Sequence, residues 1–127
     1  MAQRKAIETG RAPKAIGPYS QAIQSGDFLF VSGQLGIDPD TGKLVEGGAA
    51  GQAQRALENV RAILTEAGYD FGDVVQSQVF LSDISDFAKV NEVYKTYFKE
   101  PYPARAAIQA GALPLGAAVE ILVTAKK

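Results

Sequence analysis

Two segments of this chain carry apolar residues on both faces of a predicted β-strand, and this pattern limits the possible folds more than any other feature. In the segment 27–34, "DFLFVSGQ", two phenylalanines alternate with Leu29 and Val31. In the segment 118–125, "AVEILVTA", Leu122 opposes two valines and an isoleucine. Because successive side chains of a strand point to opposite faces, a sheet built from these strands has to be covered on both sides.

A long amphipathic helix is predicted over residues 50–67. Its apolar residues recur every three or four positions, and arginine and glutamate residues lie on or near the other side. Gly68 is suited to end this helix, because glycine readily adopts the left-handed conformation. A second helix is expected to have Ser85 or Asp86 as its N-cap and to end before Pro101. Its apolar stripe consists of Phe87, Val90, Tyr94, Tyr97 and Phe98.

Strands are predicted on both sides of these two helices. They cover residues 3–9, 19–26, 27–34, 73–82, 104–110 and 118–125. The crossover from Val74 through the second helix to Ile108 is expected to be right-handed, with its two strands parallel and both helices on one sheet face. The other face then stays apolar and uncovered. We therefore expect an obligate homo-oligomer whose interface is the helix-free face.

Composition narrows the possible function classes. With 127 residues, 46% of them hydrophobic, the chain is expected to form a single domain over residues 1–127. The chain has no cysteine and no histidine, which excludes thiol catalysis, the usual zinc ligands and imidazole acid–base chemistry. A net charge of −1 disfavours a nucleic-acid partner. The apolar runs are too short for a membrane span, and "MAQRKAIETG" lacks the apolar segment of a secretory signal. We expect a soluble protein of the cytoplasm.

Two charged residues lie within apolar strands. Arg105 shares its strand face with Ala107 and Gln109. Glu120 is surrounded in sequence by valine, isoleucine and leucine. Because an unpaired buried charge is costly, each side chain needs a partner. One interpretation pairs them with each other across a hairpin centred on residues 112–113, although "GALPLG" is longer than a favoured two-residue loop. The other is functional: Arg105 binds a ligand carboxylate through its bidentate fork, and Glu120 holds or activates water.

A set of short motifs, spread along nearly the whole chain, separates these two interpretations. The motifs are "GPYSQA" at 17–22, "FVSGQLGIDP" at 30–39, "NVRAIL", "VFLSD", "FAKVNEVYKTYF", "PYPAR" and "VEI". Together they resemble the reactive intermediate deaminase family, also called RidA or YjgF-type, over residues 17–124. The resemblance rests on the combination, since no single motif carries it.

This resemblance implies a chorismate mutase-like α+β fold, with a six-stranded mixed sheet and two helices on one face. It also implies a homotrimer with a barrel-like core and active sites between subunits, and it places another strand between those of Arg105 and Glu120. The family activity is hydrolysis of 2-imino acids and their enamine tautomers, chiefly 2-iminopropanoate and 2-iminobutanoate, to 2-oxo acids and ammonia. These intermediates come from pyridoxal phosphate-dependent dehydratases. The resemblance implies no metal and no cofactor for the hydrolysis itself.

The resemblance also implies site residues. Arg105 in "PAR" is the expected carboxylate anchor, and Glu120 in "VEI" the expected holder of the attacking water. The expected substrate-binding positions are Tyr19, Ser32, Gly33, Asn91, Arg105 and Ala107. Many relatives have a small polar residue or cysteine in place of Ala107, and a charged residue is common in place of Leu115.

Plainer interpretations of these residues stay open from the sequence alone. Asn91 is also explained as a helix-flank amide bonded to a neighbouring loop, and Tyr19 as a packed strand residue with a satisfied hydroxyl. Ser32 and Gly33 are also explained as a strand end. For the whole protein, a non-catalytic carboxylate-binding or chaperone-like trimer is an alternative to the deaminase. Ribonuclease activity, attributed to some relatives, is disfavoured by the net charge and the lack of histidine.

Overall fold

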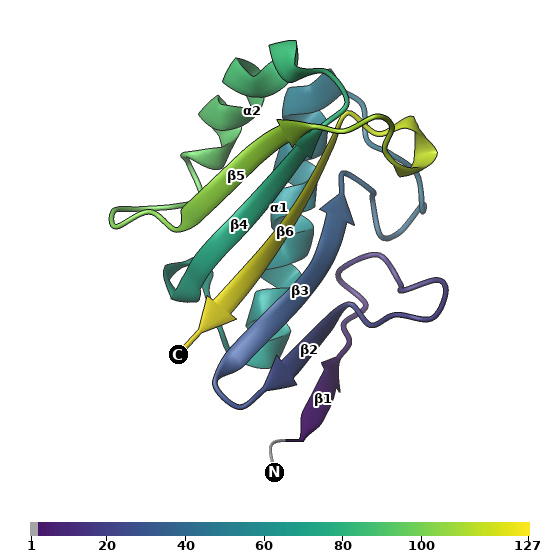
Figure 1. Ribbon diagram of the computed structural model, residues 1–127. Helices are drawn as coiled ribbons and strands as arrows, with labels where there is room; N and C mark the ends of the chain where they lie inside the picture. The colour runs from purple at the N-terminus through teal and green to yellow at the C-terminus, as the bar shows by residue number, and fades with distance from the viewer. Residues whose placement is uncertain (1–2) are drawn as a thin grey trace.

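The computed structural model describes residues 3–127 and contains one six-stranded sheet with two α-helices (Figure 1). In chain order the elements are β1 Arg4–Ile7, β2 Ala22–Ser25, β3 Phe28–Leu35, α1 Gly48–Ala67, β4 Val74–Leu81, α2 Phe87–Tyr94, β5 Ala104–Gln109 and β6 Val119–Lys126. The strands are arranged in the order β1-β2-β3-β6-β4-β5, with β4 and β5 parallel and the other neighbours antiparallel. The predicted element order and the predicted α+β fold with a mixed sheet are confirmed.

The hydrophobic core lies between the sheet and the two helices. The apolar stripe of α1, with Leu57, Val60 and Ile63 fully buried, packs on β3 and β6. Buried residues of α2 belong to the same core cluster, so both helices cover one face, and α1 crosses behind the sheet in Figure 1. Gly68 ends α1 with φ 83°, the left-handed conformation predicted for it. Within residues 3–127 no helix has the length and apolar character that a membrane span needs.

The helix α2 ends earlier than its apolar stripe predicts. It stops at Tyr94, so Tyr97 lies in the turn that follows and Phe98 directly after that turn. There the backbone tightens, because the N–H groups of Thr96 and Tyr97 each donate to a carbonyl three residues back, at 3.0 Å. Phe98 is still buried in the core. The stripe correctly predicted burial, but not the helical conformation of its last residues.

The start of α2 also differs from the prediction. Neither Ser85 nor Asp86 provides a side-chain cap to the α-helix. Instead a short 3₁₀ turn, Ile84–Asp86, precedes it, and the Asp83 carboxylate accepts the backbone N–H of Ser85 at 2.9 Å. Asp86 therefore occupies the predicted N-cap position of α2, but the side-chain capping contact is made by Asp83 on the 3₁₀ turn that precedes the α-helix.

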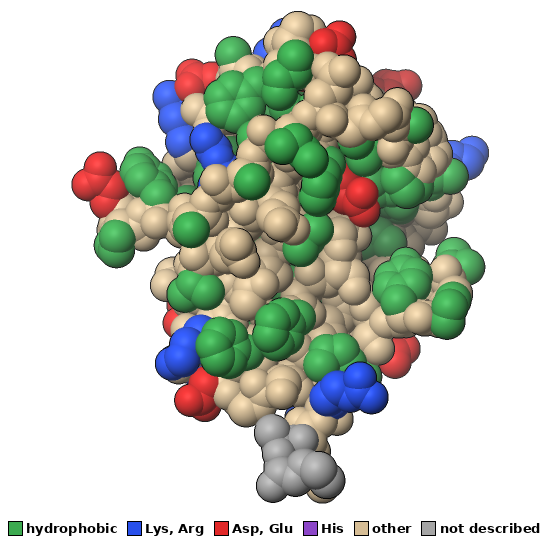
Figure 2. Space-filling model, viewed as in Figure 1, with side chains coloured by type: hydrophobic (Ala, Val, Ile, Leu, Met, Phe, Trp, Pro, Cys, Tyr) green, Lys and Arg blue, Asp and Glu red, His purple; other side chains and the backbone are tan. Residues whose placement is uncertain are grey.

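The other face of the sheet has no helix over it and carries exposed apolar side chains. Phe28, Phe30 and Ile108 are 39%, 49% and 51% exposed, while Leu29 and Val31 on the opposite face are buried. Figure 2 views this face: hydrophobic side chains are spread over the strands, and most charged side chains lie toward the outline. The two-faced apolar pattern of the sequence therefore corresponds to one covered face and one open face.

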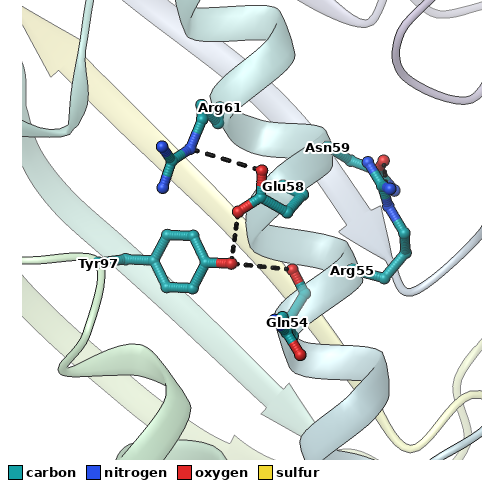
Figure 3. Close-up of polar contacts among 6 residues, drawn as sticks. All are labelled: Gln54, Arg55, Glu58, Asn59, Arg61 and Tyr97. Carbon is teal, nitrogen blue, oxygen red and sulfur yellow. Dashed lines mark hydrogen bonds and ion pairs between the residues drawn. The ribbon is translucent and has the colours of Figure 1, made fainter.

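A buried amide on α1 fixes the chain just after β3. Asn59 is fully buried, and its Nδ2 donates to the carbonyls of Leu35 at 3.2 Å and Ile37 at 2.9 Å. Arg55 Nε donates in turn to Asn59 Oδ1 at 3.1 Å, and both side chains are drawn in Figure 3. The amide thus pairs backbone groups that the end of the strand would leave unpaired.

A second polar contact of α1 holds the segment between α2 and β5 (Figure 3). The Tyr97 hydroxyl donates to Glu58 Oε2 at 2.6 Å and lies 3.4 Å from the carbonyl oxygen of Gln54. Burial, followed by the neighbouring Glu58 carboxylate, raises the pKa of Tyr97, so the phenol keeps its proton and its donor role. Through this contact α1 positions the chain that leads into β5.

We predict that Asn59→Ala lowers the free energy of unfolding by about 2–3 kcal/mol, because it removes the donors for two buried carbonyl groups. Urea denaturation measures the change. Glu66→Ala, at an exposed position of the same helix, is the control and is expected to change stability by less than about 0.5 kcal/mol. Equal stability of the two variants would show that the amide contributes nothing.

Candidate functional site

The register of the sheet places Arg105 and Glu120 on opposite faces. Arg105 pairs with Ser77 of β4, which is buried beneath the helices. Glu120 pairs with Phe80 of the same strand, whose side chain alternates with the core residues Val79 and Leu81. Residues paired across neighbouring strands share a face, so Arg105 lies on the helix-covered side and Glu120 on the helix-free side.

The interpretation in which Arg105 and Glu120 form a salt bridge across a hairpin is therefore wrong. Strand β4 lies between β5 and β6, as the resemblance implied, so the loop after β5 is not a hairpin turn. None of the ion pairs within residues 3–127 includes Arg105 or Glu120. Two charged groups in apolar strands are thus left without a charged partner among residues 3–127.

Glu120 lines a cavity of about 780 Å³, which lies between the loops before β2 and the ends of β3 and β6. The structure brings together four of the predicted site residues in its wall, together with exposed apolar side chains. These lining residues include Tyr19, Ser32, Gly33 and Glu120, with Ile16 and Leu115. Tyr19 lies in the loop before β2 and is exposed, so the packed-strand interpretation of this residue is wrong.

Gly33 allows the Glu120 carboxylate to lie directly on the β3 backbone. The register between β3 and β6 shifts between Val31 and Gln34, which leaves Ser32 and Gly33 in a bulge. Ser32 is tied back by its own hydroxyl, which donates to the Ser20 carbonyl at 2.6 Å. A Cβ at position 33 would lie 2.9 Å from Glu120 Cδ and closer still to Oε2. Any side chain here would displace the carboxylate.

Burial raises the pKa of the Glu120 carboxyl group. No other cause contributes, which agrees with the lack of a charged partner. A carboxyl group whose pKa is moved toward neutrality exchanges its proton more readily at neutral pH, as a general acid or base must. The environment of Glu120 therefore suits proton transfer to and from a bound molecule.

Arg105 lines a different cavity, which has a volume of about 470 Å³ and lies at the edge of the sheet next to α2. Arg105 Nη1 donates to Asn91 Oδ1 at 2.8 Å. The guanidinium lies over the rings of Tyr94 and Phe87, with its Cζ 4.7 Å and 5.4 Å from the two centroids. Asn91 is thus bonded to the arginine, not to a loop as its plainer interpretation proposed. The guanidinium keeps its charge available for an anion.

Comparison with known proteins shows the family of this chain. A family model described as Endoribonuclease L-PSP matches residues 9–127. The chain belongs to this family. A mouse protein named 2-iminobutanoate/2-iminopropanoate deaminase is 54% identical over 118 residues, covering 93% of this chain and 87% of the relative. The crystal structure of RidA from an Antarctic Psychrobacter is 48% identical with a TM-score of 0.93, covering 97% and 99%. Escherichia coli TdcF with bound serine is 44% identical with a TM-score of 0.91, covering 97% and 98%.

The predicted resemblance to the RidA family is therefore confirmed, while the roles of individual residues stay predictions. Ala107 lies on the same strand face as Arg105, packs partly buried against the core, and lines neither of the two cavities. Its predicted contact with substrate stays a prediction. Tyr94 was missed as a site residue, because its place in the apolar stripe accounted for it. The spacing of Phe87, Asn91 and Tyr94, at i, i+4 and i+7, puts all three on one side of α2 and was the available signal.

We predict that Gly33→Ala returns the pKa of Glu120 toward the ordinary value of a glutamate, because the added methyl group pushes the carboxyl group out toward solvent. An NMR titration of the Glu120 side-chain carbon measures this pKa. Gly111→Ala is the control, since a Cβ there meets nothing within 4 Å. A raised pKa in both variants would contradict the close approach.

We predict that Glu120→Gln raises the melting temperature at neutral pH. A carboxyl group whose pKa is raised on folding stabilises the protein fully below its unfolded pKa, and this contribution is lost as the pH rises through the folded pKa. At about pH 4, just below the ordinary pKa of a glutamate, the carboxyl group is largely protonated, so the difference between variant and wild type should shrink. Thermal denaturation at both pH values measures it, with Glu66→Gln as the exposed control. A lower melting temperature of Glu120→Gln at pH 7 would indicate a favourable partner for the carboxylate.

Proposed function

We propose that this protein hydrolyses 2-imino acids and their enamine tautomers, chiefly 2-iminopropanoate and 2-iminobutanoate, to 2-oxo acids and ammonia. Mouse, human and bovine relatives that are 53–55% identical over 93% of the chain carry the name of this deaminase. The observation that carries the proposal is the Arg105 guanidinium, which lines a cavity and has no carboxylate partner within residues 3–127. A small anion such as an imino acid carboxylate fits this group.

In the proposed reaction Arg105 holds the substrate carboxylate, and Glu120 holds the attacking water. The water oxygen bonds to the C=N carbon while one of its protons passes to Glu120. The electron pair of the broken C=N π bond goes to the nitrogen of the protonated imine, which gives a neutral carbinolamine. Glu120 then returns its proton to that nitrogen, the C–N bond breaks as the hydroxyl oxygen forms the C=O bond, and the hydroxyl proton leaves with ammonia as ammonium. Backbone groups near Gly33 steady the developing charge. Such imines also hydrolyse without a catalyst, so positioning has to lower the activation free energy by only a few kcal/mol. Each decrease of about 1.4 kcal/mol raises the rate tenfold.

We further propose that each site is shared between two copies of the chain. Arg105 and Glu120 lie on opposite faces of one sheet, so the two side chains of a single chain cannot meet on one small molecule. A head-to-tail contact between the Arg105 side of one copy and the Glu120 side of the next completes a site, and repeating it closes a ring. A homotrimer of this kind also covers the apolar helix-free face. A cytoplasmic location stays a prediction.

A carboxylate-binding role without catalysis is the second candidate. It is favoured by the related Escherichia coli TdcF, whose crystal structure holds serine, an amino acid and not an imine. In this chain the same Arg105 would hold the carboxylate of such a ligand. The two candidates differ in one property, since only the deaminase accelerates loss of the imine.

The test couples a threonine dehydratase to the purified protein and follows the decay of 2-iminobutanoate. We expect wild type to accelerate the decay and Arg105→Ala to lose about 100-fold of this acceleration, because the substrate is no longer positioned. Binding of 2-oxobutanoate without acceleration would favour the carboxylate-binding role. Cleavage of single-stranded RNA that depends on Arg105 and Glu120 would favour a ribonuclease.

Mixed oligomers test the shared site. Arg105→Ala and Glu120→Gln are each expected to be inactive, but unfolding and refolding them together should recover about one quarter of wild-type activity, since about one site in four then receives both intact side chains. Each variant refolded alone is the control. If wild type is active but the refolded mixture recovers no activity, the shared site is contradicted. The proposed deaminase reaction is not contradicted by that result.

A further inference from the structure

A buried aromatic side chain lies directly against the Arg105 guanidinium. The Tyr94 ring centroid is 4.7 Å from Arg105 Cζ, nearer than that of Phe87 at 5.4 Å. Tyr94 is only 4% exposed, and Phe98 stacks on it with centroids 4.4 Å apart. The guanidinium therefore lies on a ring that the core holds in place. Such a cation–π contact stabilises a positive charge without neutralising it.

The Tyr94 hydroxyl is anchored to the sheet beside the arginine. Its oxygen lies 2.6 Å from Ser77 Oγ, and the pair is buried. Ser77 is the register partner of Arg105 on the neighbouring parallel strand. One hydrogen bond thus ties the far end of the phenol to the strand position adjacent to the arginine backbone. The ring position is fixed relative to the base of the side chain that it supports.

Both groups that hold the guanidinium are neutral. Burial raises the pKa of Tyr94, and the hydrogen bond with Ser77 and the charge of Arg105 only partly oppose this. The phenol therefore stays protonated at neutral pH. Asn91, which accepts from Nη1, is an amide and carries no charge. An acidic side chain in either place would hold the arginine equally well but would occupy the charge that a ligand carboxylate needs.

We propose that Tyr94, anchored by Ser77, is a positioning residue that presents the Arg105 guanidinium to the substrate carboxylate. The inference rests on the proposed function, because it assigns the carboxylate of that substrate to Arg105. Tyr94 acts through the arginine: its ring sets the plane of the guanidinium, and Asn91 sets its rotation within that plane. The free donors of the fork then point in a defined direction before the ligand arrives.

The test measures binding of 2-oxobutanoate by calorimetry, together with kcat and KM for 2-iminobutanoate. We expect Tyr94→Leu to weaken binding about tenfold, because the ring face is lost. The loss should fall mainly on KM, since the carboxylate contact is present before and during the reaction. Tyr94→Phe keeps the ring and should recover most of the affinity. In an Arg105→Ala background, Tyr94→Leu should cause no further weakening.

Phe71→Leu is the matched control, because Phe71 lies edge-on to Phe98 in the same aromatic cluster, with ring centroids 5.1 Å apart, and is not the ring stacked on Tyr94. It should lower the melting temperature and leave 2-oxobutanoate binding unchanged. If Tyr94→Leu does not fold, Ser77→Ala replaces it, with binding weakened about threefold through loss of the anchor. Wild-type affinity in the folded Tyr94 or Ser77 variant, or equal weakening in Phe71→Leu, would overturn the inference. Wild type that binds through Arg105 but does not accelerate hydrolysis would overturn the proposed function alone.

Discussion

The alternation of side chains across a single sheet determines on which face each charged strand residue, Arg105 and Glu120 above all, lies. Because both helices cover one face, each strand residue belongs to the core side or to the open side according to its register. Arg105 follows Ser77 to the helix side, and Glu120 follows Phe80 to the open side. A shift of either strand by one residue would exchange these faces. The register of the hydrogen-bonded strands therefore determines the face on which each charged side chain lies, as well as the shape of the sheet.

Both charged side chains are held without being neutralised. Arg105 is supported by an amide and two aromatic rings, and Glu120 lies on the bare backbone of Gly33 with its pKa raised by burial. An internal ion pair would stabilise both groups, but it would leave neither free to bind an anion or to move a proton. The proposed deaminase needs both free groups, and the open apolar face offers a surface through which two copies can combine them.

Local patterns predicted the elements of this fold well, and their errors have local causes. Period-two and helical patterns located all six strands and both helices, and Gly68 ends α1 as predicted. The errors lie at the ends of elements: β2 begins only at Ala22, a 3₁₀ turn capped by Asp83 precedes α2, and tightened turns follow it. An apolar stripe records which residues are buried, and burial continues through Phe98 after the α-helix has ended.

The sequence alone determined the covered and open faces of the sheet and the unusual charges in its strands, and through motif resemblance it gave a prediction of the site residues. It left open whether Arg105 and Glu120 pair with each other, and only the tertiary structure decided this, by placing β4 between their strands. The contact of Glu120 with Gly33 and the support of Arg105 by Tyr94 were likewise decided there. The physical reason is that periodicity is a property of neighbouring residues, whereas strand order and register arise from pairing between segments far apart in the chain.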